Sequence, residues 1–111
     1  MNLDGLRMYV SATAERGVVS SDTTIAFTQR GALVAGRYSG GSVVGGCLWG
    51  KLAADGLAFR YLQRERSGEL HGGCSRCDVV RTSEGRIRII EHFTWTTREG
   101  TGTNVFDEVA S

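Results

Sequence analysis

The chain has 111 residues, and its 13 basic and 12 acidic side chains leave a formal charge of +1 at neutral pH. That length predicts one domain over residues 1–111, and the balanced charge gives no electrostatic basis for binding nucleic acid or an anionic membrane. No run approaches the ~18 apolar residues of a membrane-spanning helix. The first ten residues lack the basic end and apolar run of an export signal, so we expect a cytoplasmic protein without a membrane partner.

Short apolar runs with a period of two recur between turn signals along the chain, and no long segment has the 3.6-residue period of an amphipathic helix. Sixteen glycines and no proline suit strands that twist, bend and donate every backbone N–H. We therefore predict an all-β fold, an eight-stranded antiparallel up-and-down barrel of the calycin type, because the connections are short. The predicted strands are Met8–Thr13, Thr23–Gln29, Leu33–Ser39, Val43–Leu52, Leu57–Glu65, Glu69–Arg81 (bent or bulged at Gly72 and Gly73), Arg86–Thr97 and Thr103–Val109.

The seventh predicted strand places one acid on an apolar face. A carboxylate in such a wall costs several kcal/mol unless it is paired or protonated. Either a cation such as Arg37 or Arg76 meets Glu91, or its pKa is raised. Two interpretations stay open. In the first, Glu91 is structural, either in an ion pair or solvated near the barrel mouth. In the second, Glu91 anchors a ligand or acts as an acid and base. The face predicted to line the barrel interior, the lumen, carries Ile87, Ile89, Glu91, Phe93 and Trp95.

The neighbouring strands add polar groups to the same interior. In the fifth predicted strand the face with Leu57, Phe59, Tyr61 and Gln63 is the apolar one and should point into the lumen. In the third, Tyr38 alternates with Arg37. In the fourth, alternation separates Trp49 from Leu48 without showing which of the two points inward, so Trp49 is either core or interface.

Three cysteines in a chain without an export signal are expected to be reduced thiols. Cys74 and Cys77 form a C-x-x-C motif, but an offset of three places them on opposite faces of a strand. No second pair of ligands has the spacing of a zinc site, and the glycine-rich stretch 38–46 lacks the spacing of a phosphate-binding loop. We therefore expect no metal and no cofactor.

Most of the chain resembles a known family. The segment Thr23–Gln63 and the E-x-F-x-W run at 91–95 resemble small bacterial single-domain proteins that are similar to avidin and lipocalin barrels, some labelled N-acetylglutamate synthase. The segment FTQRGALVAGRYS, Phe27–Ser39, looks like the strand–turn–strand of avidin-like proteins, in which a tyrosine contacts the ligand. Tyr38 matches that position, so the resemblance implies a ligand contact there.

The expected function is therefore the binding of a small apolar or amphipathic molecule in the lumen. The alternative is a barrel enzyme, an isomerase, cyclase or hydrolase, with Glu91 as general acid and base. A third interpretation is a structural protein whose lumen is only a core. The predicted ligand-binding residues are Tyr38, Phe59, Tyr61, Gln63, Arg76, Glu91, Phe93 and Trp95.

The outer faces predict a partner as well. Val44, Leu48, Leu62 and Ile90 are expected on the outside of neighbouring strands, where they would form one apolar patch. Monomers rarely expose a large continuous apolar patch, and a two-fold dimer is the commonest way to cover one. We expect a homodimer, with a monomer as the alternative.

Overall fold

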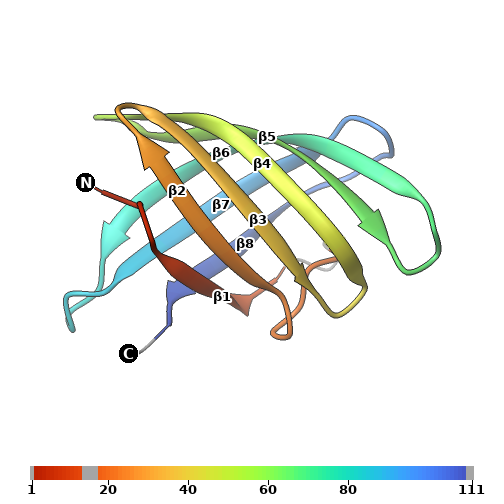
Figure 1. Ribbon diagram of the computed structural model, residues 1–111, viewed down its shortest axis with the longest axis horizontal. Helices are drawn as coiled ribbons and strands as arrows, with labels where there is room; N and C mark the ends of the chain where they lie inside the picture. Colours follow the sequence, from red (N-terminus) through yellow and green to blue (C-terminus); the bar gives the residue numbers. More distant parts are fainter. Residues whose placement is uncertain (1, 14–17, 110–111) are drawn as a thin grey trace.

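A computed structural model describes residues 2–13 and 18–109, and its strands form a closed barrel (Figure 1). Along the strands, buried and exposed side chains alternate between the inside and the outside of the barrel. Each strand is antiparallel to its neighbours in sequence, and the last strand pairs with the first. The predicted fold class, an all-β barrel of eight strands, is confirmed. The strands are β1 (Arg7–Ala12), β2 (Thr24–Arg30), β3 (Leu33–Gly40), β4 (Val43–Ala53), β5 (Gly56–Glu65), β6 (Leu70–Arg81), β7 (Ile87–Trp95) and β8 (Thr101–Glu108).

Two-residue turns connect several strands and set their register. Arg30 pairs with Leu33, so Gly31 begins a tight turn, and its φ of 60° is in the left-handed region that glycine adopts without strain. The predicted bulge at Gly72 and Gly73 is wrong, because β6 pairs with β5 through both residues without a shift, and its pairing with β7 starts at Gly73.

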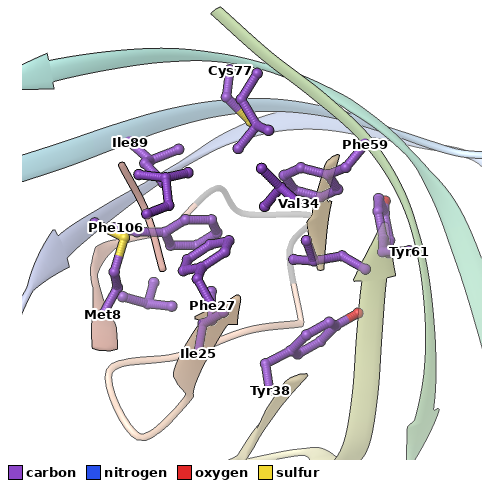
Figure 2. Packing of buried hydrophobic residues seen from close by; sticks show 14 of the residues in the cluster. Met8, Ile25, Phe27, Val34, Tyr38, Phe59, Tyr61, Cys77, Ile89 and Phe106 are labelled. Atoms are coloured by element: carbon purple, nitrogen blue, oxygen red, sulfur yellow. The ribbon is translucent and has the colours of Figure 1, made fainter. Parts of the chain in front are cut away.

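One end of the barrel is closed by packed side chains. Leu3 lies before β1 and is fully buried, and its backbone N–H donates to Oε1 of Gln29 at 2.8 Å. Figure 2 shows Met8, Phe27 and Phe106 meeting near the middle of this cluster. Burial of these apolar side chains supplies the main driving force for closing the barrel. The cluster at this end contains Leu3, Met8, Val10, Phe27, Val34, Leu57, Ile87, Ile89 and Phe106.

Four large inward side chains each lie opposite a glycine on the neighbouring strand. A Cβ atom added to Gly36 or Gly46 would press on the side chain of the large partner, which occupies that space. At Gly50 and Gly73 it would meet a backbone carbonyl first and then the large partner. Each of these large side chains therefore covers the glycine on the neighbouring strand. The four pairs are Gly36 with Leu48, Tyr38 with Gly46, Gly50 with Phe59, and Tyr61 with Gly73.

The predicted inward faces of β5 and β7 are confirmed, and the structure shows which face of β4 points inward. Trp49 is exposed, whereas Leu48 is 2% exposed and points inward, so its predicted place on the outer face is wrong. A bulge between Val43 and Gly45 explains the error. It shifts the alternation by one residue, so that Val43 and Leu48 both face inward.

Candidate functional site

A cavity occupies the end of the lumen opposite the packed cluster. It lies where β3, β5 and β7 finish and β8 begins. Its wall is mostly apolar and aromatic, with a few polar groups, as in small-molecule sites. The lining residues are Val18, Val19, Ile25, Tyr38, Leu48, Phe59, Tyr61, Gln63, Glu91, Phe93, Trp95, Asn104 and Phe106.

The cavity is nearly filled by its own side chains. The space between atoms amounts to about 400 Å³ when the part open to solvent is included, but the centre of a water molecule can occupy only about 30 Å³ of it. The smaller volume decides what fits, and it corresponds to about two water molecules. Val18 and Val19, from the connection between β1 and β2, form part of the wall, and the Ser42 hydroxyl donates to the Val18 carbonyl at 2.8 Å.

Glu91 is the acid in the wall of this cavity, and it is 5% exposed. The Ser75 hydroxyl donates to Oε2 at 2.6 Å, and Nδ2 of Asn104 donates to Oε1 at 2.9 Å. Thr13 donates to Oδ1 of Asn104, which fixes the amide with its NH₂ group toward Glu91.

The carboxyl of Glu91 makes no ion pair with any residue that the structure describes. Arg37 and Arg76 are both exposed, so the predicted pairing with either arginine is wrong. Burial raises the pKa of Glu91, and the hydrogen bonds from Ser75 and Asn104 only partly oppose it. The alternative prediction, a raised pKa, is therefore the one that the structure supports.

A chain of hydrogen bonds leads from the cavity to the barrel mouth. The Tyr38 hydroxyl donates to Oε1 of Gln63 at 2.9 Å, and Nε2 of Gln63 donates to Oε2 of Glu65 at 3.0 Å. Nη2 of Arg98 donates to the same Glu65 oxygen at 2.7 Å. Burial opposes ionisation of Glu65, but the bonds from Arg98 and Gln63 outweigh it and hold the pKa of Glu65 below its ordinary value.

Aromatic rings form a continuous row beside these polar groups. Tyr61 lies edge-on to Phe59 and to Trp95, with ring centroids 6.2 and 5.4 Å apart, and Phe93 lies edge-on to Trp95 at 5.8 Å. The Arg98 guanidinium lies 4.6 Å from the centre of the Trp95 ring. The Tyr61 hydroxyl is buried without a hydrogen-bond partner among the described residues. Burial, and then the charge of Glu91, raise the pKa of this hydroxyl.

Most predicted site residues meet in this cavity, and one does not. Arg76 lies on the outside of β6 between Ala58 and His92, because Ser75 and Cys77 occupy the inward positions. Sequence reasoning missed Glu65, although it continues the inward alternation of β5, and missed Ser75, Asn104 and Arg98. The predicted residues that do line the cavity are Tyr38, Phe59, Tyr61, Gln63, Glu91, Phe93 and Trp95.

One group of described residues has the spacing of metal ligands. Ligand atoms of Glu65, Glu69 and His71 lie within 4.8 Å of one another at the mouth. The Arg98 guanidinium already neutralises Glu65, which disfavours a second cation there. As predicted, Cys74 and Cys77 lie on opposite faces of β6, since Cys74 is half-buried on the outside and Cys77 is buried.

Comparison with known proteins gives one match. A family model described as "Avidin-like protein" matches residues 1–109. No curated protein and no solved structure matches the chain. In the part of the chain that the structure describes, no helix has the length and apolar character needed to cross a bilayer.

Proposed function

The chain belongs to the avidin-like protein family, and we propose that its barrel binds a small apolar or amphipathic molecule in the lumen. An eight-stranded barrel is just wide enough to hold one small ligand. One observation carries the proposal: among the residues that the structure describes, the buried Tyr61 hydroxyl has no hydrogen-bond partner and the buried Glu91 carboxyl in the same cavity has no counter-ion.

These two groups are costly for a barrel whose only task is to fold. A buried polar group without a hydrogen bond costs about 1–3 kcal/mol, and an unpaired buried acid raises its pKa to avoid a larger cost. The Tyr38 hydroxyl, by contrast, donates to Gln63. Buried polar groups that lack hydrogen-bond or charge partners are typical of functional sites. A ligand that accepts from Tyr61 would remove the penalty.

Entry of a ligand requires the wall to move, because the cavity holds only about two water molecules as folded. Val18 and Val19 are half-buried and lie outside the strands, so the ladder hydrogen bonds of the barrel do not hold this part of the wall. We propose that displacement of this segment, with loss of the Ser42 hydrogen bond, opens the lumen.

A fluorescence titration tests the proposal. The chain has two tryptophans, and Trp49→Phe leaves Trp95 in the cavity wall as the only one. We expect 2-phenylethanol, a small neutral amphipathic probe, to change Trp95 emission in a saturable way. Val19→Phe should block this response, whereas Val44→Phe, the same change on the outer face, should leave it intact. No saturable change, or equal binding by both variants, would count against the proposal.

A second candidate function rests on the raised pKa of Glu91. A buried carboxyl whose pKa is raised suits a general acid, so the barrel could support an isomerisation, cyclisation or hydrolysis. The two functions differ in Glu91→Gln. A binding site would lose part of its affinity, whereas an enzyme would keep binding its substrate and lose turnover.

We also propose a homodimer through the outer faces of β4, β5 and β6. Trp49, Leu62 and Leu70 are 55%, 46% and 61% exposed, and Leu62 is paired across the ladders with Cys47 and Gly72, whose small size leaves it prominent. A second copy would cover this patch. Sedimentation velocity at micromolar concentration should give about twice the 12.0 kDa of the chain. Leu62→Asp should yield monomers, whereas Tyr9→Asp on β1 should not; a wild-type monomer would refute the proposal.

The cytoplasm is the compartment that we propose for this protein. Cys47, Cys74 and Cys77 are all free thiols, which persist where the cell keeps cysteines reduced. Fractionation of cells that express the native chain would test this.

A further inference from the structure

We infer that the lumen recognises a small organic cation, a protonated amine that places its charge against Glu91 and its apolar body among the aromatic rings. This inference rests on the proposed ligand-binding function and adds the chemical class of the ligand.

The charge of the cavity wall is the first argument. Glu91 is the only charged residue among those that line the cavity, and the described wall contains no lysine, arginine or histidine. The nearest guanidinium, on Arg98, is bound to Glu65 at the mouth. An anionic ligand would therefore meet a second negative charge in a site of low dielectric, whereas a cation would supply the missing counter-ion.

Unused hydrogen-bonding capacity is the second argument. A carboxylate accepts about four hydrogen bonds, and Glu91 receives one on each oxygen, from Ser75 and Asn104. The Tyr38 hydroxyl donates to Gln63 and keeps its lone pairs for a donor. An ammonium group carries three N–H donors and no acceptor, so it matches a wall that offers acceptors.

The aromatic row is the third argument. Ring faces carry partial negative charge, and cations over them gain about 0.5–2 kcal/mol. Trp95 already attracts one cation, since the Arg98 guanidinium lies 4.6 Å from its centre. The row of Phe59, Tyr61, Trp95 and Phe93 continues from that ring into the cavity wall, where it favours a cationic body over an anionic one.

Binding of a cation should also release a proton. Burial raises the pKa of Glu91, and a positive charge beside it would favour the ionised form. Cys77, Tyr38 and Tyr61 cannot take up that proton, because burial raises their pKa values and each therefore already carries its own proton. The groups that face Glu91 are Ser75 and Cys77 on β6, Asn104 on β8, Tyr38 on β3 and Tyr61 on β5, with His92 next to it on the outside of β7.

The test uses three probes that share a phenyl body: 2-phenylethylamine, 2-phenylethanol and phenylacetate. Calorimetric titration of the full chain at pH 7.5 should show the amine binding at least tenfold more tightly than the alcohol, with phenylacetate the weakest. Repeating the amine titration in buffers of different ionisation enthalpy should show proton release. Glu91→Gln should abolish both the preference and the proton release, whereas Glu99→Gln, the same change at an exposed position, should keep both.

The outcomes separate this inference from the proposed function. If the alcohol binds in the lumen and the amine binds no more tightly, the barrel binds ligands and the inference on charge is wrong. If none of the three probes binds, the proposed function fails and the inference fails with it. A preference for the amine that persists in Glu91→Gln would overturn the role of Glu91. Circular dichroism of this variant checks its fold, and removing an unpaired buried charge favours folding.

Discussion

The Ser75 hydroxyl and the Glu91 carboxyl form a hydrogen bond of 2.6 Å across β6 and β7, inside a wall that is otherwise mostly apolar. With Asn104 on the other side, Glu91 has hydrogen bonds but no cationic partner in the part of the chain that the structure describes. Hydrogen bonds of this kind recover only part of the hydration that a carboxylate loses on burial, which is why its pKa is raised.

Glu91→Gln should change how stability depends on pH. Because the pKa of Glu91 is raised on folding, the folded state holds its proton over a window that begins at the ordinary carboxyl pKa, about 4.3, and ends at the raised value. Wild-type stability therefore falls as pH rises through that window, and the glutamine variant lacks this loss. Thermal unfolding from pH 4 to 8 should show the variant gaining relative to the wild type. Parallel curves would contradict the raised pKa.

Tyr61→Phe and Tyr38→Phe form a matched pair. The Tyr61 hydroxyl has no partner among the described residues, so its removal should leave the free energy of unfolding unchanged or raise it by up to about 1 kcal/mol. The Tyr38 hydroxyl donates to Gln63, so its removal should cost about 1–2 kcal/mol. Urea denaturation at pH 7 measures both changes. Equal losses in the two variants would show that Tyr61 has a partner in solution.

Gly46→Ala and Gly45→Ala compare neighbouring positions in β4. A Cβ atom at Gly46 would overlap the Tyr38 ring, whereas one at Gly45 meets nothing within 4 Å. We expect Gly46→Ala to destabilise the barrel by about 1–3 kcal/mol and to weaken probe binding, because the ring must move. Gly45→Ala should be neutral or slightly stabilising, since it reduces the freedom of the unfolded chain. Similar effects at both positions would contradict this packing.

The cysteines should differ in reactivity. Burial raises the pKa of Cys77, so its thiol is both covered and protonated in the folded protein. Cys47 and Cys74 are half-buried on the outer face. In the Leu62→Asp variant, whose outer face no second copy covers, iodoacetamide labelling at pH 8 followed by peptide mass spectrometry should modify Cys47 and Cys74 in the native state and Cys77 only in urea. Native labelling of Cys77 at the rate of Cys74 would show that β6 opens.

Alternation along single strands was enough to predict the inward faces of β5 and β7, because neither strand contains a register shift. It failed where the backbone departs from that period. The bulge in β4 moved Leu48 to the inside. Arg76 was predicted among the ligand-binding residues of the lumen, but β6 puts Ser75 inward and Arg76 outside.

The partners of Glu91 depended on register between strands, which a single sequence does not contain. Asn104 lies opposite Glu91 only because β7 and β8 pair as they do, and a slip of one residue would turn it to the outside. Arg98 belongs to the connection between β7 and β8, where no periodic pattern indicates which side chain returns to the barrel.

Each glycine that lies under a large neighbour shares one volume with it, and this has an evolutionary consequence. A single mutation in such a pair destabilises the barrel, because a larger residue at the glycine overlaps the partner and a smaller partner leaves an empty space. A reciprocal exchange keeps the total side-chain volume and moves the large side chain to the neighbouring strand. Relatives of this chain should therefore show covariation within the pairs Gly36–Leu48 and Tyr38–Gly46, where an added Cβ atom meets only side-chain atoms of the partner. Through such paired steps a lineage can reshape the lumen for a different ligand while the barrel stays folded at every viable stage.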